Sequence, residues 1–177
     1  IYKQKMKNII IIGSSGAIGL EFLKQYALNP DIKKIYSFSR KNINFSSEKI
    51  SHFAIDIENE DSIIECSSKI KDSIDAIIIA TGFLHDKNIK PEKRLSDVSK
   101  LTLQKNLAVN FIGPALILRY FSPFLRKDIK TIIAILSARV GSISDNKIGG
   151  WYSYRASKAA LNQLIKTSSI ENKFKLP

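Results

Sequence analysis

Residues 7–19 read KNIIIIGSSGAIG, an apolar run that leads into three regularly spaced glycines, Gly13, Gly16 and Gly19. The four isoleucines at 9–12 form a short apolar run of the length expected for a strand inside a sheet. After the glycines, apolar residues recur at helical spacing until Asn29 and Pro30 interrupt the pattern. This stretch therefore predicts a strand, a glycine turn and a helix in that order.

A glycine turn in this position has a known chemical use. It lets backbone N–H groups and the start of the helix meet a pyrophosphate, because the helix dipole favours negative charge there. Glycines also end strands for structural reasons alone, so the position after the first strand of a strand–helix–strand unit is what favours a nucleotide site. The predicted phosphate-binding residues are those of the turn: Gly13, Ser14, Ser15, Gly16, Ile18 and Gly19.

The rest of the chain continues the same alternation. Apolar runs predict further strands at 32–38, 50–55, 74–80 and 129–136, the last two buried, and helical spacing predicts helices at 62–70, 98–125 and 152–170. Strands separated by helices imply right-handed crossovers and a parallel sheet covered on both faces. We therefore predict a doubly wound α/β fold, with residues 1–177 forming one nucleotide-binding domain.

The two ends of the sequence suggest a partial chain. Met6 stands directly before the first predicted strand, so residues 1–5 could precede the true start. The last predicted helix should lead into a sixth strand, and the sequence stops shortly after it. We expect that the C-terminal strands of the domain are missing here, either because the chain is a fragment or because the gene has decayed.

Composition excludes several classes of protein. The single cysteine, Cys66, rules out an internal disulfide, and the cytoplasm is therefore the default location. His52 and His85 lack the spacing of metal ligands, so no metal site is predicted. The net charge of +12 raises the alternative of a nucleic-acid binder, but the basic residues are scattered, which favours a solvated basic surface. The apolar segment 107–125 contains Asn110 and Arg119 and indicates a buried helix instead of a membrane span.

The end of the second predicted strand indicates which dinucleotide would bind. NAD-binding proteins place an acid there on the adenosine ribose, whereas here Ser39, Arg40 and Lys41 follow and no acid occurs before Glu48. The guanidinium of Arg40 could bind a 2′-phosphate through two parallel hydrogen bonds. NADP(H) is therefore the preferred cofactor, NAD(H) stays open, and the alternative is that Arg40 is an ordinary surface residue.

Tyr154 and Lys158 stand four residues apart on the last predicted helix, so their side chains share one face. A nearby ammonium lowers the pKa of a phenol by favouring the phenolate, which makes the pair a proton donor and acceptor. Of the six tyrosines, only Tyr154 is followed by a lysine at this spacing. The pair also follows a predicted strand, at the edge of the sheet where ligands bind in such folds.

The order of these motifs resembles the short-chain dehydrogenase/reductase family, which has a Rossmann-type fold. The motifs are the glycine turn, Asp56-Ile57, Ala80-Thr81-Gly82, Asn110, Ser137 and the Tyr154/Lys158 pair, and they span nearly the whole chain. The segments 82–86, 140–143 and 149–158 are most similar to the C-factor and sniffer-like carbonyl reductases.

The resemblance implies hydride transfer between a nicotinamide and a carbonyl or alcohol carbon of a small molecule, with Tyr154 as general acid/base. It also implies that Lys158 holds the nicotinamide ribose, that Asn110 supports a proton-relay water, and that Ser137 contributes to catalysis. Tyr154 is also implied in cofactor binding, and the remaining residues with this implied role are Ser39, Asp56, Ile57, Ala80, Thr81 and Gly82. Structural roles stay open for three sites: a helix kink or cap for Asn110, a helix cap for Asp56 and a strand end for residues 80–82.

Two positions depart from the family pattern. The middle glycine of the turn usually stands where Ala17 is found here, so we expect a slightly altered turn that still binds phosphate. The serine that orients the substrate usually stands where Ala138 is found. Ser137 and Ser142 are the candidates to replace its hydroxyl, and Ser137 is preferred.

These departures leave a second function open. The main alternative to a reductase is a signalling or regulatory protein that binds the dinucleotide and turns over little. The substrate cannot be derived from these residues. The oligomeric state also stays open, a homo-oligomer included.

Overall fold

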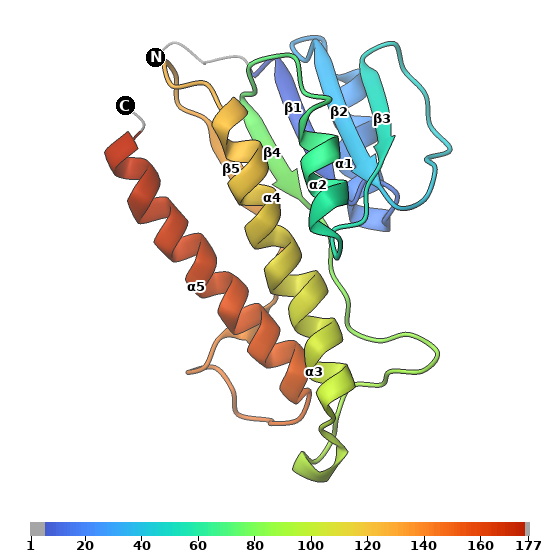
Figure 1. Cartoon of the computed structure of the whole chain (residues 1–177), viewed down its shortest axis with the longest axis vertical. Helices are drawn as coiled ribbons and strands as arrows, with labels where there is room; N and C mark the ends of the chain where they lie inside the picture. The colour runs from blue at the N-terminus through green and yellow to red at the C-terminus, as the bar shows by residue number, and fades with distance from the viewer. Residues whose placement is uncertain (1–5, 176–177) are drawn as a thin grey trace.

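The computed structural model describes the backbone of residues 6–175 and the side chains of residues 6–172. Its centre is a parallel sheet of five strands in the order β3-β2-β1-β4-β5 (Figure 1). The strands are β1 (Asn8–Ile12), β2 (Lys34–Ser39), β3 (Ile50–Ala54), β4 (Ala76–Ile79) and β5 (Ile132–Ile135). The direction in which successive strands are added to the sheet reverses between β1 and β4. This strand order confirms the predicted doubly wound α/β fold of Rossmann type.

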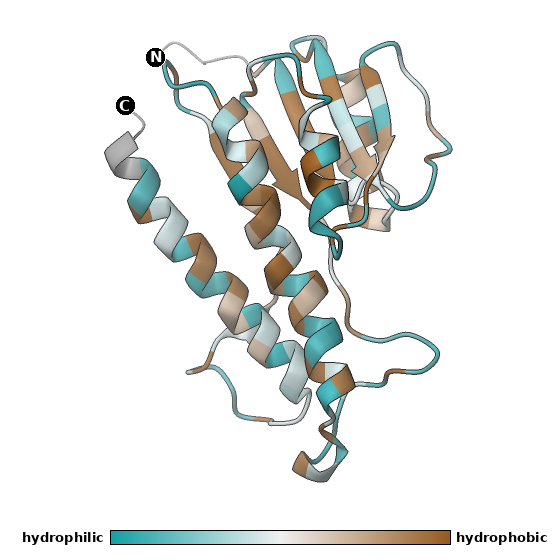
Figure 2. Ribbon diagram, in the orientation of Figure 1, coloured by the Kyte–Doolittle hydropathy of each residue, from teal (hydrophilic) through white to brown (hydrophobic). Residues whose placement is uncertain are grey.

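Helices cover both faces of the sheet, as the alternating side chains of β1 require. Ile9 and Ile11 pack with α1 (Ala17–Leu28) on one face, whereas Ile10 and Ile12 join a second cluster on the other. That second cluster takes in side chains from α2 (Glu60–Ser67) and α4 (Gly113–Phe121). Because successive residues of a strand point to opposite faces, a strand of four isoleucines supplies both halves of the core. Figure 2 shows the hydrophobic residues concentrated along the central strands.

The predicted long helix at 98–125 consists of three parts. α3 (Lys100–Leu107) passes through a π-helical turn, Ala108–Ile112, into α4. Gly113 follows the turn, and a Cβ there would lie 2.8 Å from the backbone oxygen of Ile57, so only glycine lets the helix approach the loop after β3 this closely. The π-helical turn holds Asn110, and turns of this kind are frequent at functional sites.

The stretch Lys100–Phe124 is long and apolar enough to cross a membrane, judged by length and composition, and no other helix of the described residues is. In this structure Val109, Ile117, Leu118 and Phe121 of this stretch pack into the core over the sheet. The absence of a membrane span therefore stays a prediction.

The predicted burial of the fifth strand is wrong. Within the described sheet β5 pairs with β4 alone, and its residues alternate between exposed and partly buried, with Ile132 47% exposed. An apolar run shows that a strand prefers burial, but its actual burial depends on what packs beside it. By contrast β4, with neighbours on both sides, is buried at every residue, as predicted.

Candidate functional site

The glycine turn after β1 is shaped by close backbone contacts. Gly13 has φ +87°, and a Cβ on it would lie 2.9 Å from Cγ2 of Thr81. A Cβ on Gly19 would lie 2.8 Å from the carbonyl carbon of Gly13 and closer still to its oxygen. Gly16 begins α1 without a side-chain cap, and a Cβ there would meet the Gly13 oxygen at an ordinary 3.4 Å. Gly13 and Gly19 are thus required by packing, whereas Gly16 leaves the first amides of the helix open to an anion.

A cavity of about 260 Å³ opens beside this turn, and we call it the turn cavity. It brings together residues from the ends of β1, β2, β3 and β4, where ligands bind in sheets of this kind. The predicted residues that line it are Gly13, Ser15, Gly16, Ser39, Arg40, Ile57, Ala80, Thr81 and Gly82, and Lys41, Ile55, Glu58 and Val109 complete the lining. The hydroxyl oxygen of Thr81 is buried without a hydrogen-bond partner among the described residues, which fits a polar ligand at this place.

Six predicted cofactor residues do not line the turn cavity: Tyr154 and Lys158, described below, and four residues of the turn and strand ends. Ser14 is buried beneath it, where its hydroxyl donates to the backbone oxygen of Phe38 and accepts a hydrogen bond from Ser37. Ile18 points to solvent, and Gly19 supports the turn from behind. Asp56 is exposed, with its carboxylate bound to the N–H of Glu58 at 3.0 Å. The alternative of Asp56 as a helix cap is wrong, because Asn59 caps α2.

Arg40 lines the turn cavity and forms a loose ion pair. Its guanidinium is 3.8 Å from the carboxylate of Glu58, and its side chain is 67% exposed. Glu58 is held more closely by Lys105, at 2.6 Å. Exposed pairs such as Arg40–Glu58 contribute at most about 1 kcal/mol, so the guanidinium could exchange this partner for a phosphate at little cost.

Tyr154 and Lys158 lie on one face of α5 (Tyr152–Lys175), as their spacing predicts. Lys158 is only 2% exposed; its Nζ donates to the backbone oxygen of Leu136 at 2.9 Å and lies 5.8 Å from the centre of the Tyr154 ring. Burial lowers the pKa of Lys158 and raises the pKa of Tyr154. The predicted lowering of the tyrosine pKa is therefore wrong for this structure, because the loss of solvation of the phenolate determines the direction.

Gly82 connects the turn cavity to this pair. A Cβ on Gly82 would lie 3.7 Å from Oδ1 of Asn110 and 3.8 Å from Nζ of Lys158, and Gly82 itself lines the turn cavity. The ammonium of Lys158 and the amide of Asn110 therefore lie next to Gly82, which is one of the residues that line the turn cavity. The fold thus brings Asn110 and Lys158, which are far apart in the sequence, to the same residue of the cavity lining.

Asn110 joins three parts of this site. Its Oδ1 accepts from the N–H of Phe83 at 2.8 Å, while its Nδ2 donates to the oxygen of Phe83 at 2.8 Å and to the hydroxyl of Ser157 at 3.0 Å. A further contact joins Nδ2 to Oδ1 of Asn106 at 3.3 Å. The side chain is fully buried, so these bonds fix the loop after β4 against α5.

Sequence reasoning missed two members of this network. Asn106 and Ser157 are both buried, and Ser157 also donates to the backbone oxygen of Tyr154 at 2.8 Å. Asn106 precedes Asn110 by four residues, so helical spacing could have placed it on the same face. Nothing in the sequence distinguished Ser157 from the other serines.

The two candidate serines have different surroundings. The hydroxyl of Ser137 donates to Oδ1 of Asn162 at 2.6 Å. Asn162 lies on α5, four residues after Lys158. Ser142 accepts from the N–H of Asp145 at 3.3 Å within the following loop. Ser137 thus lies against the helix that carries Tyr154, and its preference over Ser142 stays a prediction.

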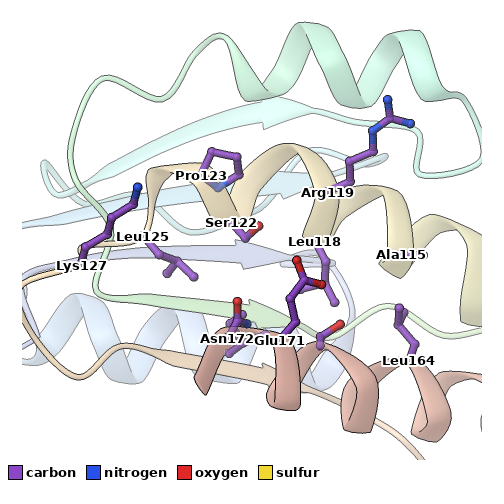
Figure 3. A pocket seen from close by; sticks show the side chains of 12 residues that line it. Ala115, Leu118, Arg119, Ser122, Pro123, Leu125, Lys127, Leu164, Glu171 and Asn172 are labelled. Carbon is purple, nitrogen blue, oxygen red and sulfur yellow. The ribbon is translucent and has the colours of Figure 1, made fainter. Parts of the chain in front are cut away.

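A larger cavity, of about 670 Å³, lies between α4 and the second half of α5 (Figure 3). Leu118 and Leu164 line it from the two helices, together with Ile133 of β5. None of the residues predicted for catalysis or cofactor binding contributes to it. The turn cavity, which is lined by nine of the residues predicted for cofactor binding, is therefore the candidate site. Among the described residues, no group of three or more His, Cys, Asp or Glu side chains is arranged to hold a metal ion.

Comparison with known proteins identifies relatives of this chain. The model of the short chain dehydrogenase family matches residues 7–174. C-signal of Myxococcus xanthus is 34% identical over 77 residues, which are 44% of this chain and 46% of that protein, so the match spans less than half of this relative.

Solved structures show the same fold. Carbonyl reductase Sniffer of D. melanogaster has a TM-score of 0.86 at 21% identity, covering 97% of this chain and 77% of that one. The NADPH-bound carbonyl reductase from chicken fatty liver has a TM-score of 0.84 at 17% identity, covering 98% of this chain and 73% of that one. The match of the family model to residues 7–174 confirms the resemblance predicted from the motifs at the level of the family, and the solved structures confirm the fold.

Proposed function

Because this chain belongs to the short chain dehydrogenase family of oxidoreductases, we propose that it is an NADP(H)-dependent reductase acting on the carbonyl group of a small molecule. The proposal rests on one observation above all, the meeting of the turn cavity with Lys158 and Asn110 at Gly82. The backbone of the glycine turn would hold the phosphates of a dinucleotide, and Lys158 would hold its nicotinamide ribose. When bound, the dinucleotide would supply or accept the hydride.

The side chains have separate roles in this proposal. Tyr154 gives a proton to the carbonyl oxygen during reduction and takes it back during oxidation. Lys158, held by the oxygen of Leu136, presents its ammonium to the nicotinamide ribose. Asn110 keeps the loop after β4 at a fixed distance from α5 and supports the proton path, and Ser137 orients the substrate oxygen.

The direct test is the consumption of NADPH by the purified chain with a panel of aldehydes and ketones. We expect turnover with at least one small carbonyl compound, and a lower rate with NADH. NADPH that binds but is oxidised no faster with any carbonyl than without one would contradict the proposal.

That contrary result would favour the second candidate, a regulatory protein that binds the dinucleotide and turns over little. One observation supports this candidate: alanine stands at 138, where the family has a serine, and the neighbouring Ser137 hydroxyl is bound to Asn162.

Arg40→Ala tests the cofactor preference. Loss of a charge-assisted hydrogen bond to the 2′-phosphate should weaken NADPH binding by roughly 10–150-fold, the equivalent of about 1.5–3 kcal/mol. Binding of NADH, which has no 2′-phosphate, should change little. Fluorescence titration with each cofactor measures both dissociation constants.

Arg119→Ala is the matched control for Arg40. Its side chain is 68% exposed and 3.5 Å from Glu60, nearly the same setting as Arg40, but it lies on α4 away from the turn cavity. It should leave both affinities unchanged. Equal weakening of NADPH and NADH binding by Arg40→Ala would count against a 2′-phosphate contact.

A further inference from the structure

The backbone that leads into α5 has an unusual conformation. Gly149, Gly150 and Trp151 have φ values of 73°, 65° and 54° in succession, and Trp151 is the one non-glycine residue of the described chain with positive φ. Side chains other than that of glycine disfavour this region, so the surrounding contacts must hold the tryptophan in place. The next residues are those of the first turn of α5, which carries Tyr154.

Glu92, in the loop after β4, supplies part of those contacts, and Arg155 supplies others by donating to the backbone oxygens of Gly149 and Gly150. The backbone oxygen of Glu92 accepts from the N–H of Trp151 at 2.6 Å. Its carboxylate accepts from the N–H of Ser153 at 3.3 Å and from the Ser153 hydroxyl. A Cβ on Gly150 would lie 3.3 Å from the same backbone oxygen, so the two segments are in close contact.

The carboxylate of Glu92 is buried, which makes these bonds necessary. Glu92 is 4% exposed, and a buried carboxylate is costly unless donors surround it. Burial acts to raise the pKa of Glu92, but the hydrogen bonds from Ser153, from the backbone of Glu92 itself and from Thr102 together outweigh burial and hold the pKa below its ordinary value. The first turn of α5 offers such donors, and its dipole favours a negative charge there.

Trp151 links this arrangement to the proposed acid/base. Its ring packs edge-to-face against the ring of Tyr154, with the ring centres 6.2 Å apart. A shift in the start of α5 would therefore move both rings together. We propose that Glu92 is a positioning residue that, through Ser153 and Trp151, fixes the direction from which the Tyr154 hydroxyl meets the substrate. This inference rests on the proposed reductase function.

Two variants test the proposal. Glu92→Gln replaces one accepting oxygen with an amide NH₂ that cannot accept from Ser153, and Ser153→Ala removes the hydroxyl donor while keeping the N–H. Each should lower kcat by roughly tenfold through a small displacement of the reacting groups, with the dissociation constant of NADPH changed less than about twofold. The double variant should be about as impaired as the worse single variant, because both remove the same contact.

Trp151, the only tryptophan in the sequence, gives a readout that does not depend on activity. In both variants its fluorescence should shift to the red, and its quenching by acrylamide should rise by about twofold, at temperatures well below unfolding. The control is Asp97→Asn in the same loop, where the carboxylate accepts from the N–H groups of Lys93 and Arg94. This control should leave both the fluorescence and kcat unchanged.

The outcomes separate the two proposals. Unchanged Trp151 fluorescence and kcat in the Glu92 and Ser153 variants would overturn the positioning role, as would equal losses in the Asp97 control. If Glu92→Gln fails to fold, Ser153→Ala alone decides. Absence of turnover in the unmodified chain would instead overturn the proposed function, and the quenching comparison alone would then show whether Glu92 holds the start of α5.

Discussion

Replacing Tyr154 with phenylalanine is expected to lower the rate of carbonyl reduction by roughly 10²–10⁴-fold, the usual contribution of a positioned proton donor. Burial raises the pKa of this phenol from the ordinary value of 10.0, so it stays protonated across neutral pH and can donate. The variant loses the only atom that carries this proton and keeps the ring that packs against Trp151. NADPH affinity and thermal stability should therefore be unchanged, and steady-state kinetics with fluorescence titration would measure the difference.

Tyr152→Phe is the natural comparison for Tyr154→Phe. Tyr152 begins the same helix, is 39% exposed, and carries the same phenol outside the network of Asn110 and Ser157. It should retain nearly the full rate. Equal rates for the unmodified chain and the Tyr154 variant would remove the acid/base role and, with it, the redox assignment of this site.

The second large effect is expected from Gly19→Ala. The added methyl group would meet the backbone carbonyl of Gly13. Neither this carbonyl nor helix α1 can move without disturbing the turn. Overpacking of this kind costs about 1–3 kcal/mol, which corresponds to a melting temperature lower by about 2–12 °C for a chain of this size. Because the displaced group belongs to the turn cavity, NADPH affinity should fall as well.

Gly16→Ala separates crowding from a general need for glycine in the turn. Its Cβ would meet the Gly13 oxygen at 3.4 Å, and its φ of −76° suits alanine. This variant should melt within about 2 °C of the unmodified chain, as expected for a substitution that creates no clash. A Gly19 variant as stable as the Gly16 variant would show that the turn adjusts more freely than its contacts indicate. Calorimetry on both variants would decide.

Local patterns in the sequence were sufficient for much of the fold. The isoleucines of β1 followed by glycines predicted the first strand, turn and helix, and the alternation along the chain predicted a parallel sheet. These predictions succeed because hydrophobic periodicity and glycine conformation act over a few residues. The burial of β5 could not be predicted in this way, since burial depends on neighbours in space.

Features of the site could likewise be predicted where they depend on local sequence, and not where they depend on distant segments. Tyr154 and Lys158 were predicted to share a face because helical spacing is a local property, and the glycine turn was recognised from its position after a strand. The raised pKa of Tyr154, the bond from Ser137 to Asn162 and the exposure of Asp56 depend on which segments the folded sheet brings together. The role proposed for Glu92 also depends on the fold. In the sequence Glu92 is one of several acids in a polar loop, and only the folded chain brings its carboxylate to Ser153, 61 residues away. The order of the amino acids was enough to show which groups the chain carries and which helix faces they share. Their solvation and their partners are set by contacts between distant segments, and these contacts exist only in the folded chain.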